Sequence, residues 1–104
     1  MKRVIFLLDA QDSLDEITRY TEENWPDPDQ EAGTLPKYVV SIINACNDIP
    51  RRVTFLTDAA RNTKYGIVRY FKRGRHFIFY RETEESFEVI QILHERMNFA
   101  AYLD

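Results

Sequence analysis

The sequence has 104 residues, of which 44% are hydrophobic and 30% charged, and its formal net charge is −3. This length fits one domain covering 1–104, and the hydrophobic content excludes the class of disordered, weakly hydrophobic chains. The apolar run at 4–8 is far shorter than the roughly 20 residues that a membrane span needs. A single cysteine allows no internal disulfide, so we expect a cytoplasmic protein.

Charge is unevenly distributed along the chain. Residues 1–50 carry 4 basic and 10 acidic side chains, a net −6, whereas residues 51–104 carry 10 basic and 7 acidic, a net +3. Within 51–75, eight cations face a single carboxylate, Asp58. The pattern indicates an acidic module and a basic module on one fold, although two ordinary solvated faces would give the same pattern.

The first elements along the chain are a predicted strand and a predicted helix. The run 3–8 is β-branched and aromatic, and it is too short for a buried helix, so it predicts a strand. Residues 9–24 follow the spacing of an amphipathic helix, with Asp9 or Ser13 expected to cap its first turn. The face expected to be buried consists of Ala10, Leu14, Ile17 and Thr21.

A second helix is predicted after a proline-rich connection at 25–37. It should begin near Thr34 as N-cap and carry Pro36 in its first turn, where a missing N–H costs little. Pro50 should end it, because proline cannot continue the helical hydrogen bonds. Its predicted apolar face consists of Leu35, Val39, Ile42, Ile43, Cys46 and Ile49.

After a basic connector at 51–64, three strands are predicted at 66–72, 76–82 and 87–93, with Gly74 at the tip of the first hairpin. Both faces of the last strand are mostly apolar, so it should lie inside the sheet and be covered on each side. The overall prediction is an α+β fold: an N-terminal strand and an antiparallel helix pair packed on an antiparallel β-meander. Strict alternation would put Phe87, Val89, Gln91 and Leu93 on one face of that strand, and Glu88, Ile90, Ile92 and His94 on the other.

Few residues have the spacing of a reactive site. His76, His94 and Cys46 share no metal-ligand spacing, so we expect neither a metal nor a cofactor, and Cys46 should act as a small buried hydrophobe. The second half also carries side chains suited to acid–base cleavage of RNA, but no obvious base stands beside them, so the favoured interpretation is that they solvate strand ends and pair with nearby glutamates. These are Arg69, Arg75, Tyr80, Arg81, His94 and Arg96.

Two segments resemble a known family. Residues 13–25, SLDEITRYTEENW, resemble the first helix of the ParE toxins, in which Leu, Ile, Tyr and a closing Trp recur. Residues 66–98 resemble the meander of the same family and its Leu-His-x-Arg-Met-Asp ending, with Asn98 in place of the common Asp. The chain is therefore similar to the RelE/ParE toxin superfamily, in its ParE (plasmid stabilisation) branch. The likeness is weaker at 26–64, so the conformation there stays open.

The resemblance implies a type II toxin that a cognate ParD-like antitoxin neutralises. RelE-like members cut messenger RNA on the ribosome, whereas ParE-like members bind and inhibit DNA gyrase and are not enzymes. The nuclease pattern is an adjacent His-Arg pair, but here Glu95 separates His94 from Arg96, and the acidic total charge disfavours a ribosome-binding protein. We therefore expect a gyrase inhibitor that forms a hetero-oligomer with its antitoxin and binds neither DNA nor membranes. Dimerisation of the free toxin stays open.

Three sets of site residues follow, mainly from the resemblance. Antitoxin contacts are expected at Leu14, Ile17, Tyr20, Trp25, Phe77 and Phe79. Gyrase contacts are expected on a basic, exposed rim formed by Arg73, Arg75, His94, Arg96 and Met97. The alternative function, a ribosome-dependent mRNA endonuclease, would use Arg69, Tyr80, Arg81 and His94 as catalytic residues. A further alternative is a folded member that no longer poisons a target and serves only as an interaction module.

Overall fold

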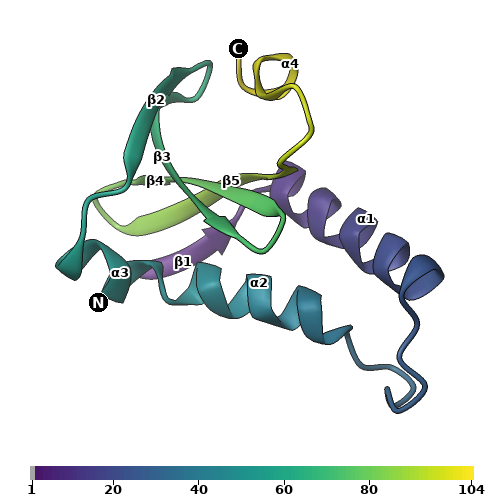
Figure 1. The fold of residues 1–104 in the computed structure, drawn as a ribbon. Coiled ribbons are helices and arrows are strands. Elements are labelled where there is room, and N and C mark those ends of the chain that lie inside the picture. Colours follow the sequence, from purple (N-terminus) through teal and green to yellow (C-terminus); the bar gives the residue numbers. More distant parts are fainter. Residues whose placement is uncertain (1) are drawn as a thin grey trace.

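The computed structural model describes residues 2–104 and has an α+β fold, as predicted. Figure 1 shows one twisted sheet, with α1, α2 and α3 on one side and the short α4 beside the β2–β3 end. The elements are β1 (Arg3–Phe6), α1 (Leu8–Asn24), α2 (Lys37–Asn47), α3 (Ile49–Phe55), β2 (Ala59–Thr63), β3 (Gly66–Arg73), β4 (His76–Glu82), β5 (Ser86–His94) and α4 (Phe99–Leu103).

The sheet has five strands in the order β1-β5-β4-β3-β2. β1 pairs with β5 in parallel, while β2 to β5 form an antiparallel meander. The meander therefore has one strand more than predicted, because the segment 51–64 is not only a connector. It contains most of α3 and the whole of β2, whose sequence AARNT lacks the apolar alternation that marks a strand. β2 is formed by its pairing with β3, a tertiary contact that its own residues do not indicate.

β5 lies between β1 and β4 and is buried on both faces, as predicted, but its side chains do not alternate strictly. The register with β4 shifts by one residue between Phe79 and Tyr80, which is a β-bulge in β5. Val89 and Ile92 consequently face the helices, whereas Ile90 packs on the opposite face. The predicted grouping of Ile90 with Ile92 is therefore wrong, since one extra residue reverses every later side chain.

The helix boundaries also differ from the predicted ones. β1 ends at Phe6 and α1 begins at Leu8, with Leu7 as an N-cap that makes no side-chain hydrogen bond. Neither Asp9 nor Ser13 caps the helix: the Ser13 hydroxyl donates to the Asp9 carbonyl (2.9 Å), and the Asp9 carboxylate accepts from Tyr65 (3.0 Å). The potential cap of α1 is used instead for a contact with the β2–β3 turn.

The second predicted helix is divided into two. α2 begins after Pro36, which is its N-cap, while the Thr34 hydroxyl donates to the Glu31 carbonyl and does not cap the helix. α2 ends at Asn47, and Pro50 occupies the first turn of α3 rather than ending a helix. Proline at this position leaves no donor unsatisfied, because the first N–H groups of a helix have no internal partner.

Two apolar cores lie on the two faces of the sheet. The larger core packs α1, α2 and α3 against the sheet through residues such as Ile17, Ile42 and Cys46. On the other face, Leu103 of α4 packs on Val68 and Phe79. Among the helices described for 2–104, none is both long and apolar enough to cross a membrane.

Candidate functional site

The tip of the β3–β4 hairpin and the last residues of β5 lie together at one end of these strands. In the strand register, Arg73 lies opposite His76, and His76 lies opposite His94. The Glu95 amide donates to the Arg75 carbonyl (2.8 Å). The five residues predicted for target binding therefore gather in one place, which we call the hairpin rim. It consists of Arg73, Arg75, His94, Arg96 and Met97.

Tyr38 of α2 fixes the shape of this rim. Its hydroxyl accepts a hydrogen bond from the Arg75 amide (3.0 Å) and shares another with His76 Nδ1 (2.7 Å). Gly74 has a φ of +61°, and a Cβ there would lie 2.6 Å from Tyr38 Cε1. The turn thus needs glycine twice, for its left-handed backbone and for the close approach of the tyrosine ring.

The two histidines of the rim lie against each other. Their ring centroids are 5.1 Å apart, and the planes are nearly perpendicular at 87°. Burial of the His76 ring, together with the nearby His94, lowers the pKa of His76 to about 4, although the Glu95 carboxylate opposes this. His76 is therefore neutral at pH 7 and holds the turn by its hydrogen bond to Tyr38, while the Arg96 amide donates to His94 Nδ1 (3.1 Å).

The surface of the rim is basic. Glu95 is paired with Lys72 (2.6 Å) and more loosely with Arg75 (3.6 Å), and the hydrogen bond from Lys72 lowers the pKa of this carboxyl. Arg73 and Arg96 are exposed and form no ion pair with any described residue. Met97, which is 39% exposed, adds an apolar side chain to the charged surface. A basic surface that includes an exposed apolar side chain is suited to binding an acidic protein surface.

Three of the four residues of the alternative nuclease site, Arg69, Tyr80 and Arg81, line one cleft, and His94 does not. Tyr80 is 1% exposed, and its hydroxyl donates to the Asp58 carboxylate (2.7 Å). Burial and this hydrogen bond raise the pKa of Tyr80, so it is a poor proton donor or acceptor at neutral pH. Arg69 lies beside it and donates to the Asp58 carbonyl (2.6 Å), which ties Arg69 to the same internal network.

Arg81 is held by partners of its own, and His94 lies apart from the other three residues. Arg81 follows Tyr80 directly on β4 and is bound to Glu88 (2.6 Å) and to the Tyr65 carbonyl (2.7 Å). His94 pairs with His76, four residues along β4 from Tyr80, which is roughly 13 Å at the usual rise of a strand. His94 is therefore separated from the other three residues of the set.

Comparison with known proteins identifies the family. Residues 4–99 match the family described as the ParE toxin of the type II toxin-antitoxin system parDE. The chain belongs to the ParE toxin family. A solved structure described as the chromosomal ParDE TA system from P. aeruginosa has the same fold, with a TM-score of 0.67, 16% identity, and coverage of 90% of this chain and 96% of that one. No curated protein matches significantly.

The six residues predicted to contact the antitoxin of this ParE-family chain divide by burial. Tyr20 is 62% exposed and Trp25 is 72% exposed, so both are available to a partner, and Leu14 is half-buried. Ile17 is 9% exposed and packs in the core between the helices and the sheet. Ile17 therefore holds α1 on the sheet and offers no free surface.

Phe77 and Phe79 lie on the face of the sheet that α4 covers. Phe79 is fully buried, and Phe99 of α4 stands edge-on to both rings at centroid distances of 5.3 Å. Phe79 is therefore part of the second core and presents no free surface. Phe77 is half-buried and borders the same cluster.

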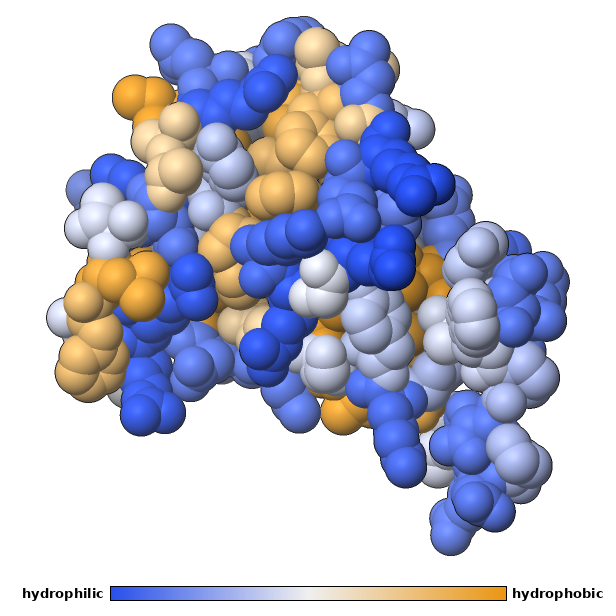
Figure 2. All heavy atoms as spheres, in the orientation of Figure 1, coloured by the Kyte–Doolittle hydropathy of each residue, from blue (hydrophilic) through white to orange (hydrophobic). Residues whose placement is uncertain are grey.

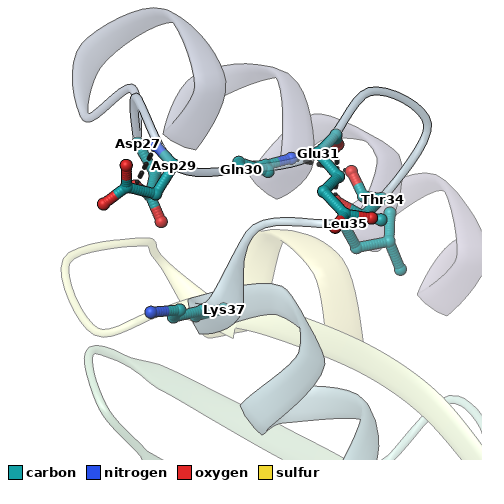
Figure 3. A pocket seen from close by; sticks show the side chains of 7 residues that line it. All are labelled: Asp27, Asp29, Gln30, Glu31, Thr34, Leu35 and Lys37. Atoms are coloured by element: carbon teal, nitrogen blue, oxygen red, sulfur yellow. Dashed lines mark hydrogen bonds between the residues drawn. The ribbon is translucent and has the colours of Figure 1, made fainter.

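Acidic side chains gather at the tip of the helix pair, in the connection between α1 and α2. Asp27, Asp29 and Glu31 border a shallow hollow of about 200 Å³, with Lys37 on its far side (Figure 3). Asp29 and Glu31 are exposed, and the Asp27 carboxylate accepts from the Asp29 amide (2.9 Å). Among residues 2–104, no group of three or more His, Cys, Asp or Glu side chains is arranged to hold a metal ion. The tip is thus a solvated acidic surface.

Asp58, Arg52 and Tyr38 are structurally central, yet sequence reasoning did not select them as site residues. Asp58 alone had a signal, because a single carboxylate among eight cations in 51–75 is the natural partner for a buried charge. It receives two hydrogen bonds from Arg52, at 2.8 and 2.7 Å. Nothing in the sequence marks Tyr38, whose role comes from the packing of α2 against a hairpin 35 residues away.

Proposed function

We propose that this member of the ParE family is a toxin that inhibits DNA gyrase by binding to it, without catalysing a reaction. It acts in the cytoplasm and is neutralised by a cognate ParD-like antitoxin. The observation that carries the proposal is the hairpin rim, where three side chains are exposed: Arg73, on the turn that Tyr38 binds, and Arg96 and Met97, which follow β5. A basic surface that includes an apolar side chain and is held by internal hydrogen bonds suits recognition of a protein target, because little conformational entropy is lost when it binds.

The state of the polar side chains supports binding over catalysis. Tyr80 and Arg81 are engaged in internal hydrogen bonds, and the pKa of Tyr80 is raised, so neither is poised for proton transfer. In contrast, the arginines of the rim have few internal partners. Exposed charges of this kind raise association rates and select partners by complementary charge.

Contacts with the antitoxin are proposed on the part of α1 that extends beyond the sheet. Tyr20 and Trp25 are the largest exposed aromatic side chains of this segment, at 62% and 72%. Aromatic residues with a polar edge are the usual anchors of protein interfaces. A helical antitoxin segment lying against α1 would cover both rings.

The test is a supercoiling assay with purified gyrase and the purified chain. We expect loss of supercoiling and accumulation of gyrase–DNA cleavage complexes. Because two attractive charges become repulsive, the double variant R73E/R96E should need at least roughly tenfold more protein for the same effect. The matched control R19E reverses an exposed arginine on α1 and should behave like the unchanged protein.

The outcome that rejects the proposal is equally clear. If supercoiling and cleavage-complex levels stay unchanged while the chain cuts ribosome-bound messenger RNA, the nuclease function is correct. In that case R81A or H94A should abolish cleavage without unfolding the protein. A folded chain that does neither would be an interaction module.

A further inference from the structure

Glu95 is a carboxylate that stands among the cations of the hairpin rim. It follows β5 directly, and its amide donates to the Arg75 carbonyl (2.8 Å), so the backbone fixes its place beside the β3–β4 turn. Figure 2 shows strongly hydrophilic side chains gathered where Figure 1 places this turn. A negative charge is thus built into a surface that is otherwise basic.

The carboxylate of Glu95 engages two cations at once. Its Oε2 lies 2.6 Å from Lys72 Nζ, and its Oε1 lies 3.6 Å from Arg75 Nη1. The hydrogen bond from Lys72 keeps the pKa of Glu95 below its ordinary value, although burial opposes this, so the group is ionised at neutral pH. The charges of Lys72 and Arg75 are therefore compensated from within the chain.

Arg73 and Arg96 are in a different state. Both are exposed, and neither forms an ion pair with any residue of the range 2–104. Lys72 and Arg75 could add two more positive charges to the same surface, but Glu95 holds both. The rim therefore offers a partner two unpaired arginines with a carboxylate beside them.

This arrangement distinguishes between two kinds of anionic partner. Nucleic acid carries a dense, regular array of phosphates, about one charge per 1.7 Å of duplex axis, and its binding depends on neutralising several of them. A phosphate that approached Lys72 or Arg75 would also meet the carboxylate of Glu95. An acidic protein surface carries separate carboxylates, which can meet Arg73 and Arg96 while a hydrogen-bond donor faces Glu95.

We infer that Glu95 is a specificity-determining residue of the hairpin rim, which excludes nucleic acid by occupying Lys72 and Arg75 and by placing a negative charge where a phosphate would lie. The inference rests on the proposed function only for the reason why a protein partner is favoured. An inhibitor of gyrase works among a large excess of DNA, whose many non-specific sites would otherwise compete for a basic surface.

The test is a fluorescence anisotropy titration of a short, fluorescein-labelled DNA duplex with the full chain and with E95Q, over a range of potassium chloride concentrations. Because E95Q releases Lys72 and Arg75, we expect it to bind the duplex at least roughly tenfold more tightly at low salt. The slope of log affinity against log salt should also become steeper by about 2, since each neutralised phosphate contributes about 0.9.

Two further variants locate the effect. E82Q removes another paired carboxylate, the partner of Lys2, and changes the total charge by the same amount; it should change the slope by less than about 1, because it frees at most one cation. The triple variant E95Q/K72Q/R75Q should lose the gain. The side chains of Lys72, Arg75 and Glu95 are all partly exposed, so these changes leave the core intact, which circular dichroism checks.

Several outcomes overturn the inference. Equal affinities and slopes for E95Q and the unchanged chain would do so, as would a gain that the triple variant keeps or that E82Q reproduces. A slope of about 4 for the unchanged chain would also do so, because all four cations would then reach phosphates in spite of Glu95. The assay contains no gyrase, so failure here is distinguishable from failure of the proposed function, which the supercoiling assay measures.

Discussion

Replacing Asp58 by alanine should destabilise the fold more than any other single change to a charged residue described above. The carboxylate is 8% exposed, and it accepts hydrogen bonds from Arg52 (2.8 and 2.7 Å) and from the buried hydroxyl of Tyr80 (2.7 Å). Burial alone would raise the pKa of Asp58, but the hydrogen bonds from Arg52 and Tyr80 lower it below its ordinary value. The charged form is therefore the stable form in the fold.

The size of the effect follows from the partners that remain. D58A leaves the Tyr80 hydroxyl buried without an acceptor, while the Arg52 side chain, 31% exposed, recovers part of its hydration. The loss should therefore be about 3 kcal/mol, at the lower end of the range for breaking a buried pair. For a chain of this length, that corresponds to a fall in Tm of roughly 12–24 °C.

Urea unfolding followed by circular dichroism measures this loss. Y80F keeps the Arg52–Asp58 pair and should cost only about 1 kcal/mol. The double variant should cost less than the sum of the two single variants, because each removes the same hydrogen bond. D104A, which removes an exposed partner of Arg61 at 3.4 Å, is the control and should cost less than about 1 kcal/mol.

The pH dependence has a defined sign. Because the folded-state pKa of Asp58 is lowered, its contribution is fully present above the ordinary aspartate pKa of about 4 and is lost as the pH falls below it. If D58A cost less than about 1 kcal/mol, or if the two single losses simply added, the network would not be the anchor described here.

Three further predictions concern other positions. G74A should destabilise the protein more than G33A, since both glycines have positive φ but only the Cβ at Gly74 would strike Tyr38; equal losses in urea unfolding would refute the contact. Burial raises the pKa of Cys46 to about 12, so a thiol reagent should label it only after unfolding, and rapid labelling of the native protein at pH 8 would contradict its burial. Because the pKa of His76 is lowered to about 4, the unfolded chain binds its proton first, and the free energy of unfolding should fall between pH 6.5 and pH 4; H76Q should flatten that slope, and an unchanged slope would exclude this histidine as the cause.

Local residue patterns were enough to predict much of the fold. Helical spacing of apolar residues predicted α1 with its buried Ala10 and Ile17. The strands β3, β4 and β5 were predicted from their many β-branched and aromatic residues. Because both faces of 87–93 are mostly apolar, an interior strand was also predicted there, and β5 confirms it. These features depend on the types of residues close together in the sequence, so they can be predicted from the sequence alone.

The missed elements have no such local signal. β2 consists of polar and small residues, and it becomes a strand because β3 supplies its hydrogen bonds. The bulge opposite Phe79 and Tyr80 is likewise a property of the β4–β5 pair, although it decides which face every later side chain of β5 meets.

For the candidate sites, the sequence determined the residue types and the tertiary structure decided their availability. The uneven charge and the motif around His94 indicated a basic region, and the structure gathers Arg73, Arg75 and Arg96 at one rim. Spacing alone could not reveal that Phe79 is covered by α4 or that Tyr80 is bound to Asp58. Burial and pairing depend on residues far apart in the chain, so only the folded arrangement separates a surface arginine from one held in an internal network.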